Sequence, residues 1–449
     1  MKTHSSRRQF LQAGAGAVGA AFAAKTIRLE AEPTRESRQG PASDRVRFGM
    51  IGVGMQGSGL LATSVHLPGV ECVAASDLYD GRHARAREIA GATLRTTRRY
   101  QELLDDKSID CIVAAVPDHW HRQIVVDAVS AGKDIYCEKP MSHTVADGRA
   151  MVAAAKKSGR IVQIGSQRTS SVLCAKAREL VAQGVLGELQ LVEGSMGRNS
   201  PTGVWVYPPP PDLSPSTLDW DTWQGDVPKR PFDPKIFARW RCWKEYGTGV
   251  AGDLMVHLLS GMLYTWGINE APTRVTAMGG IRRFDDGRNM PDVHLSLFEY
   301  GDVPVYIRLN LGSETPEILR FLGSKGILEL TETGITFRAQ RGVDTAPSYY
   351  TGSFPGPLRY EYVETWHAEH DPRPAEEPLT DGVSYEGDSY DDTRPHLWKF
   401  FQAVKTRQPV VQDAVFGHHA AIACHMANES YFQKRPVTFD PTAETIRTG

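Results

Sequence analysis

Two short stretches of the chain combine residue types that can move protons. In IYCEKPM (135–141) an apolar run ends on Glu138 and Lys139. Pro140 follows directly and restricts the backbone, so we expect the peptide bond before it to be constrained or cis. A lysine aimed by this corner into a crevice would stabilise negative charge on a substrate oxygen or relay a proton. A solvated Glu-Lys pair in a surface turn is the alternative, but it does not explain the apolar residues before the pair.

The second stretch, GDLMVHLL (252–259), carries Asp253 and His257 among apolar neighbours. A spacing of four places both side chains on one face of a helix. Burying an aspartate and a histidine without partners is costly, so we expect an acid–base pair. A core pair bonded to backbone groups and a metal site are the alternatives. No further ligands with suitable spacing accompany the two residues, so we expect no metal.

A glycine-rich turn follows the first apolar strand, in VRFGMIGVGMQGSGLL (46–61). Gly52 permits the tight turn, Gly54 lets a pyrophosphate approach the backbone, and Gly57 lets the helix pack on the strand. Met55 and Gln56 lie at the helix N-terminus, which would face the phosphates. The alternative is a glycine turn with a structural role alone.

A second strand, VECVAASD (70–77), ends in Asp77, twenty residues beyond Gly57, where an acid would hold ribose hydroxyls. Together with the glycine turn it predicts a dinucleotide site. Asp77 favours NAD, although Arg82 just beyond it would be able to meet the 2′-phosphate of NADP.

The elements around these residues alternate between strands and helices. Helices are expected at 81–90, near 100–106, at 119–131 and at 144–158, and further strands at 110–117, 134–140 and 160–166. This alternation predicts a parallel, doubly wound sheet, whose ligand lies outside the carboxyl ends of the strands. Pro117, Glu138, Lys139 and Gln167 all fall at such ends and should converge on one crevice, where Glu138 would meet a cofactor ribose or Lys139.

The second half of the chain has a different texture. A helix (170–183) and a strand (189–197) precede a long segment rich in Pro and Trp (199–245), and alternating runs beyond 270 predict a large, mostly antiparallel sheet. A looped, acidic insertion is expected at 343–390, and two helices at 392–406 and 414–433. Trp240 and Arg241 in the Trp-rich segment, with Arg168, are candidates for substrate contact. Its aromatic rings would form a platform for sugars or plug a seam between domains, and the sequence leaves both open.

The length, net charge and cysteine content of the chain restrict the class of protein. The chain has 449 residues and a formal charge of -2, too little positive charge for a nucleic-acid partner. Its six scattered cysteines suit free buried thiols. SRRQFL (6–11), followed by a weakly apolar run, closely matches a twin-arginine export signal and is too short to insert in a membrane. We therefore expect a signal and linker at 1–44, a Rossmann domain at 45–167, and an α+β substrate-binding and oligomerisation domain at 168–449.

Gly52, Gly54 and Gly57, the stretch VPDHWH (116–121) and EKP (138–140) together strongly resemble the glucose–fructose oxidoreductase/inositol dehydrogenase (Gfo/Idh/MocA) family. The resemblance extends over most of the chain beyond the signal. It implies that the Asp253/His257 helix faces the nicotinamide with His257 as acid/base, that His121 contacts cofactor or substrate, and that the chain forms a dimer or tetramer. His119 and His121 would also be able to form a His-x-His metal site, the less favoured alternative.

The resemblance also implies a sugar, polyol or glycoside substrate. His257 would remove a hydroxyl proton with Asp253 orienting it, Lys139 would hold the oxygen, and the carbon's hydride would pass to the nicotinamide. The first alternative is a redox-neutral glycosidase, which acts by transient oxidation and elimination with tightly bound NAD, as some exported members of the family do. The second is a non-catalytic sugar-binding or scaffold protein. The export signal would place any of the three in the periplasm or another extracytoplasmic space.

Overall fold

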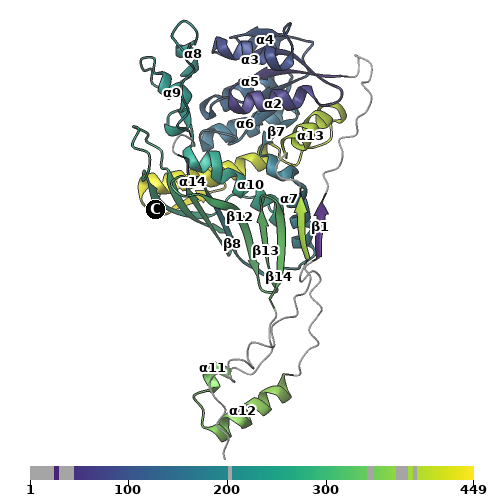
Figure 1. The fold of residues 1–449 in the computed structure, drawn as a ribbon, viewed down its shortest axis with the longest axis vertical. Coiled ribbons are helices and arrows are strands. Elements are labelled where there is room, and N and C mark those ends of the chain that lie inside the picture. Colours follow the sequence, from purple (N-terminus) through teal and green to yellow (C-terminus); the bar gives the residue numbers. More distant parts are fainter. Residues whose placement is uncertain are drawn as a thin grey trace, which may run out of the picture.

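The computed structural model describes residues 25–29, 45–200, 205–340, 348–370, 383–387 and 392–448. The proposed export signal lies outside these residues. Within them the chain forms two sheets, one of six strands and one of eleven, with helices on their faces (Figure 1).

The six-stranded sheet is parallel and has the order β4-β3-β2-β5-β6-β7. The strands lie where the apolar runs predicted them, and β4 is an additional short strand. Their bounds are β2 (Val46–Ile51), β3 (Val70–Ser76), β4 (Arg95–Thr97), β5 (Cys111–Ala114), β6 (Asp134–Glu138) and β7 (Val162–Gly165). Helices connect the strands: α2 (Met55–Val65), α3 (Asp80–Ala90), α4 (Gln101–Asp105), η2 (Asp118–Trp120), α5 (His121–Ser130) and α6 (Val145–Ser158). The predicted doubly wound Rossmann fold is thus confirmed.

The eleven-stranded sheet is mostly antiparallel, with the order β1-β15-β14-β13-β12-β8-β11-β10-β9-β16-β17, and only the pairs β1–β15 and β8–β11 are parallel. Its strands are β1 (Lys25–Leu29), β8 (Leu189–Gly197), β9 (Arg274–Gly280), β10 (Val293–Tyr300), β11 (Val303–Asn310), β12 (Thr315–Gly323), β13 (Gly326–Thr331), β14 (Gly334–Ala339), β15 (Val383–Gly387), β16 (Val437–Asp440) and β17 (Thr445–Thr448). This sheet and its helices confirm the predicted α+β class of the second half.

Buried residues alternate along the central strands, so one face of the large sheet is apolar. That face packs on α7 (Val172–Ala182) and α10 (Val256–Trp266), and these helices share one core with α14 (Ala414–Gln433). The other face is open to solvent over the described residues. It carries ion pairs of Arg320 with Glu193 and Glu329, and exposed Met278 and Leu297.

The two C-terminal helices return to the nucleotide-binding sheet. Phe401 of α13 (Thr393–Thr406) packs in one core with Phe48 of β2, and Ala421 of α14 packs in the core on the opposite face of that sheet. The neighbouring Ile422 belongs to the core of the large sheet. α14 therefore lies between the two sheets and packs against both.

Segments expected to be linker or loop contain regular structure. The linker expected over residues 25–44 begins with β1, an edge strand of the large sheet. The looped insertion expected at 343–390 holds two helices, α11 (Ser348–Thr351) and α12 (Gly356–Glu369), and β15, so the expectation of a loop is wrong for its described part. α12 has no buried residue and lies away from both sheets (Figure 1). None of the described helices combines the length and hydropathy needed to cross a membrane.

Candidate active site

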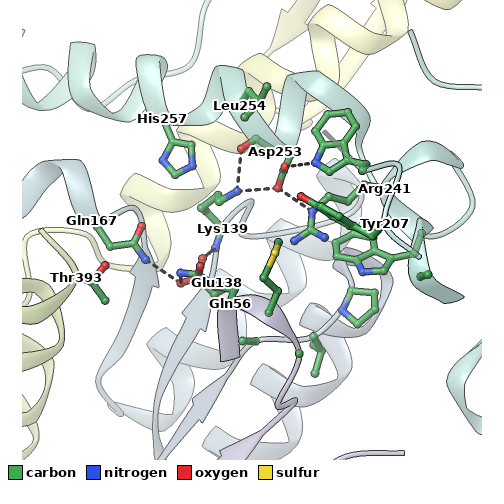
Figure 2. A pocket seen from close by; sticks show the side chains of 18 of the residues that line it. Gln56, Glu138, Lys139, Gln167, Tyr207, Arg241, Asp253, Leu254, His257 and Thr393 are labelled. Carbon is green, nitrogen blue, oxygen red and sulfur yellow. Dashed lines mark hydrogen bonds and ion pairs between the residues drawn. The ribbon is translucent and has the colours of Figure 1, made fainter. Parts of the chain in front are cut away.

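A cavity of about 700 Å³ lies where the carboxyl ends of the parallel strands face the second domain. Pro117, Lys139 and Gln167, from the loops after β5, β6 and β7, line it as the strand order predicted. Asp253 and His257 approach from the opposite wall (Figure 2). The three candidate catalytic side chains, predicted from stretches more than 100 residues apart, therefore share one cavity.

The glycine turn borders the cavity, and Gly54 is the member of the turn that lines it. Gly52 has φ +84°, and a Cβ there would lie 2.3 Å from the Ala115 carbonyl oxygen. A Cβ on Gly57 would lie 2.0 Å from the Gly52 carbonyl oxygen, so Gly57 is buried beneath the turn and does not line the cavity. Gly54 caps the N-terminus of α2 and is open to the cavity, as are Met55 and Gln56. Backbone N–H groups of a helix start are thus presented to this space.

A second void of about 260 Å³ adjoins the cavity and shares Arg82 and Pro117 with it. Gly52 and Asp77 line this void. The Asp77 carboxylate accepts from the backbone N–H groups of Val53 (2.8 Å) and Tyr79 (3.0 Å), and Arg82 Nη1 lies 3.4 Å from it. The acid at the end of β3 is therefore fixed beside the glycine turn, as the spacing predicted.

Asp253 is surrounded by three donors. Its Oδ1 accepts from Lys139 Nζ (2.8 Å) and Arg241 Nε (3.1 Å), and its Oδ2 accepts from Trp205 Nε1 (2.8 Å). Lys139 Nζ also donates to the Asp253 carbonyl oxygen (2.8 Å). Burial alone would raise the pKa of Asp253, but the charges of Lys139 and Arg241 hold it far below its usual range. The structure thus differs from the expectation that Asp253 orients His257, because its carboxylate holds Lys139.

A local break in helix regularity places these groups. Asp253 lies in a π-helical turn (Ala251–Met255) that precedes α10, on which His257 lies. Such turns are frequent at functional sites. The Lys139–Pro140 peptide is cis, which agrees with the constrained or cis peptide expected from the sequence.

His257 is held as a neutral base. Burial first, and then the positive charges of Lys139 and Arg168, lower its pKa well below the usual value. Its ring faces the cavity near Lys139 (Figure 2). A half-buried neutral imidazole that lines a cavity is able to accept a proton at neutral pH.

Glu138 is the centre of a buried network. Its Oε1 accepts from Gln56 Nε2 (3.1 Å), Gln167 Nε2 (2.8 Å) and the Tyr136 hydroxyl (3.2 Å). Burial raises the pKa of Glu138, opposed by the charge of Lys139 and by these hydrogen bonds. Glu138 therefore lines the cavity as expected, and its carboxylate joins the helix α2 to the loops after β6 and β7.

His121 does not lie where the resemblance implied. Its ring is 1% exposed and is absent from the cavity wall. Nδ1 lies 2.7 Å from the Pro140 carbonyl oxygen and Nε2 lies 3.0 Å from that of Val116. With both nitrogens at backbone carbonyls, His121 joins two loops behind the cavity wall. This corrects its assignment as a cofactor-binding residue.

His119 faces the seam between the domains. Its ring nitrogens lie 3.2 Å from the Tyr246 carbonyl oxygen and 3.0 Å from that of Trp223. His119 and His121 are therefore both bound to backbone carbonyls instead of a shared metal site. Across the described ranges, no group of three or more His, Cys, Asp or Glu is placed to hold a metal ion.

The Trp-rich segment contributes both to the seam between the domains and to the wall of the cavity. Trp220 and Trp223 stack with ring centroids 4.9 Å apart, and the Trp223 carbonyl oxygen accepts from Trp120 Nε1 of the nucleotide domain, so these rings fill the seam. Trp205, Tyr207 and Trp240 line the cavity. The candidate substrate residues Arg168, Trp240 and Arg241 all lie on its wall, and Arg241 stacks on the Trp240 ring at 4.2 Å.

Sequence reasoning missed several residues of the cavity wall. They come from the large sheet, the Trp-rich segment and the start of α13: Met196, Arg198, Trp205, Tyr207, Glu317, Glu332, Asp392 and Thr393. For Glu317 a signal was present, because it stands on the inward-facing, otherwise apolar side of β12. The six cysteines are free, as predicted, and all but half-buried Cys72 are fully buried.

The observed groups fit NAD. Gly54 leaves the N-terminus of α2 open, Asp77 stands in the adjoining void, and Lys139 and His257 face the same cavity. A dinucleotide would therefore find an acid for its adenosine ribose, a phosphate-binding helix start and an acid–base cluster in that order. Fold and site together define a two-domain dinucleotide-binding protein.

Comparison with known proteins supports the family that the sequence resembles. A family model described as an oxidoreductase family with an NAD-binding Rossmann fold, Gfo/Idh/MocA, matches residues 46–166. Inositol 2-dehydrogenase of Salmonella typhimurium is 30% identical over 151 residues, 33% of this chain and 45% of that protein. Glycosyl hydrolase family 109 protein 1 of Shewanella sp. (strain ANA-3) is 30% identical over 202 residues, 41% of this chain and 44% of that protein. The matched region thus spans less than half of either relative.

Solved structures extend the similarity to both domains. Aldose-aldose oxidoreductase from Caulobacter crescentus, complexed with glycerol, has a TM-score of 0.62 at 19% identity and covers 88% of this chain and 100% of its own. Levoglucosan dehydrogenase, in complex with NADH and levoglucosan, has a TM-score of 0.60 at 19% identity and covers 88% and 99%. At this identity the similarity shows the fold. The family model over residues 46–166 supports the Gfo/Idh/MocA family for the nucleotide-binding domain.

Proposed function

We propose that this protein is an exported NAD-dependent oxidoreductase that removes a hydride from a hydroxyl-bearing carbon of a sugar, polyol or glycoside. The observation that carries the proposal is the convergence of Lys139, Asp253 and His257 on one cavity above the glycine turn. The names of the similar proteins, an inositol dehydrogenase and a levoglucosan dehydrogenase among them, support a polyhydroxylated substrate.

The residues divide the work as follows. NAD, when bound, supplies the hydride acceptor. His257 accepts the proton of the substrate hydroxyl, and its lowered pKa keeps it neutral and ready to do so. Lys139 uses its ammonium protons on the Asp253 carbonyl and carboxylate oxygens, which leaves one donor for the substrate oxygen. Arg241 and Trp205 hold Asp253, and so hold Lys139 at the reacting oxygen.

Asp77 supports NAD as the preferred cofactor. Its carboxylate lines the void beside the glycine turn, where a ribose 2′-hydroxyl would bind it and a 2′-phosphate would be repelled. Arg82 beside it is the feature that favours NADP. Tight retention of the cofactor belongs to the proposal, and native mass spectrometry of the freshly purified protein tests it.

A redox-neutral glycosidase is the second candidate, and the similarity to a glycosyl hydrolase family 109 protein favours it. In this reaction the same residues support oxidation of one carbon, loss of the acidified neighbouring proton and elimination of the glycosidic bond. Water then adds and the hydride returns, so no net oxidation occurs.

One experiment separates these functions. The purified chain is incubated with a panel of sugars, polyols and aryl glycosides, with and without added NAD. A dehydrogenase accumulates reduced cofactor in proportion to substrate, whereas a redox-neutral glycosidase releases aglycone without net reduction and without added NAD. Neither signal across the panel would overturn both enzymatic functions and favour a non-catalytic sugar-binding protein.

Export is supported by the twin-arginine pattern at residues 6–11 and by the weakly apolar run after it. Residues 1–44 fused to a folded reporter should direct it out of the cytoplasm, and Arg7→Lys with Arg8→Lys should abolish this. Retention of the unmodified fusion in the cytoplasm would contradict export.

A further inference from the structure

A buried ion pair lies on the cavity wall formed by the second domain. Arg168, in η3 (Gln167–Ser170), is paired with Glu317 of β12, and both line the cavity. Glu317 is 7% exposed and precedes Leu319 and Phe321 on the buried side of its strand. A charged pair therefore interrupts an apolar face at the point where this face meets the cavity.

The backbone is irregular at this point. The register of β12 against β8 shifts between Thr315 and Ile318, directly beside Glu317. Irregularities of this kind redirect side chains and are common next to active sites. Here the carboxylate is turned toward the cavity and toward Arg168.

Stability alone does not account for this pair. Removing two charges from water costs about as much as their attraction returns, and apolar residues of similar volume often stabilise as well or better. The low exposure of Glu317 leaves its carboxylate poorly solvated, and burial raises its pKa in spite of Arg168. A ligand that hydrogen-bonds to both groups would offset this cost.

The chemistry of the pair selects the ligand. A guanidinium offers only donors and a carboxylate only acceptors, whereas a hydroxyl group both donates and accepts. Two neighbouring hydroxyls would therefore bind the pair, one toward each member. An anionic substituent is disfavoured, because Glu317 already neutralises Arg168 and repels a second negative charge.

The pair stands next to the reacting groups. Arg168, Glu317 and His257 line one small void of about 10 Å³ in addition to the main cavity. Gln167, adjacent to Arg168 in η3, donates to Glu138 in the network beside Lys139. One short turn thus connects the Glu138 network with the Arg168–Glu317 pair.

We propose that Arg168 and Glu317 form a subsite for two neighbouring hydroxyl groups of the substrate, next to the carbon that faces His257. This inference rests on the proposed function and narrows its substrate class to neutral polyols or sugars with a vicinal diol beside the oxidised carbon. Glu317 is thereby a specificity-determining residue, because it distinguishes a diol from its deoxy analogue.

The test is a substrate-by-mutant cycle in the full chain. kcat/KM is measured for the best substrate of the panel and for its single-deoxy analogues, with the wild type and Glu317→Gln. In the wild type one deoxy analogue next to the oxidised carbon should lose about 10- to 100-fold, the range for a hydrogen bond to a charged group. With Glu317→Gln, kcat/KM for the same analogue should be no more than about three-fold below that for the unmodified substrate, because the group that binds the hydroxyl is altered.

Glu329→Gln is the matched control. Glu329 is paired with Arg320 on the solvent-facing side of the large sheet, so this variant should keep the wild-type discrimination. Glu317→Asp provides a second variant that retains the charge and should also weaken discrimination if Glu317→Gln fails to fold. Undiminished discrimination in a folded Glu317 variant would overturn the subsite while the oxidoreductase function stands. A wild type that oxidises no polyol would overturn the proposed function itself, and the subsite with it.

Discussion

The two walls of the cavity are built by different means. The nucleotide-domain wall depends on backbone geometry: Gly52 has a positive φ, Gly57 admits a close backbone approach, and α2 presents its N-terminus. The opposite wall depends on side chains that hold one another, as Trp205 holds Asp253 and Arg168 holds Glu317. Cofactor binding should therefore tolerate most side-chain changes in the second domain, whereas turnover and selectivity should depend on single polar groups there.

Lys139 reaches from the first wall to the second, and its removal should have the largest effect. Lys139→Met keeps the length of the side chain but removes the donor to the substrate oxygen and the partner of Asp253. We expect kcat to fall about 100- to 1,000-fold, as for loss of a group that stabilises developing charge. Affinity for NAD, measured by calorimetry, should change by less than about three-fold, because the glycine turn is untouched.

Lys156→Met, on the exposed surface of α6, removes the same charge away from the cavity and should leave both quantities unchanged. A kcat for Lys139→Met within ten-fold of the wild type would contradict the assignment of Lys139 to the reacting oxygen.

Trp205→Phe tests a single hydrogen bond of the second wall, the one from Trp205 to Asp253. Trp205 has φ 69°, an uncommon conformation for a bulky residue and a sign that its surroundings hold it in place. Phenylalanine keeps an aromatic ring but removes the indole N–H that donates to Asp253. We expect kcat to fall about ten-fold with the KM for NAD unchanged, since one hydrogen bond to a charged group is lost.

Trp220→Phe is its control, because the Trp220 N–H donates to the Arg230 carbonyl oxygen away from the cavity. Equal losses of kcat in the two variants would show that the Trp-rich segment has only a structural role.

Acid should weaken the second half of the chain more than the first, with the smallest effect of the three. In the second half, burial lowers the pKa of His294, His396 and His418 to about 4 and that of His425 to about 3, whereas in the first half it lowers the pKa of His119 to about 4. The unfolded chain binds these protons near the ordinary pKa of 6.5, so the folded state loses stability as the pH falls from about 6.5 toward 3 and keeps it fully above that window. Each pKa unit corresponds to about 1.4 kcal/mol of the free energy of unfolding.

Hydrogen exchange at pH 7 and pH 5 measures this difference. Amides around β10 and α14, which carry His294 and His425, should lose more protection than those of β2, β3 and β5. Equal losses in both halves would mean that the buried histidines do not set the acid response.

The nucleotide domain and the catalytic cluster could be predicted from the sequence because each rests on a local pattern. Alternating strands and helices fix the strand ends to one edge of a sheet. The spacing of Asp253 and His257 predicted one helix face, and the structure brings both to the cavity through a π-helical turn before α10. A motif match alone was less dependable. His121 occupies a family position, yet its ring bonds to two backbone carbonyls behind the wall.

The remaining parts depend on contacts between distant segments. Glu317 is recognisable locally as a charge on the apolar side of β12, but its place on the cavity wall depends on the register of β12 and on its pairing with Arg168. α12 was missed for a different reason. It buries none of its residues, so its sequence lacks the apolar stripe with helical period that would indicate a helix.

The position of α14 between the two sheets affects how the protein unfolds. One helix supplies Ala421 to the core beneath the nucleotide-binding sheet and Ile422 to the core of the large sheet. Loss of either domain would remove a buried partner from the other, so unfolding of one domain by heat or denaturant should destabilise the other. The same shared helix restrains hinge rotation, so access to the cavity would depend on local rearrangement of its rim instead of a swing of whole domains.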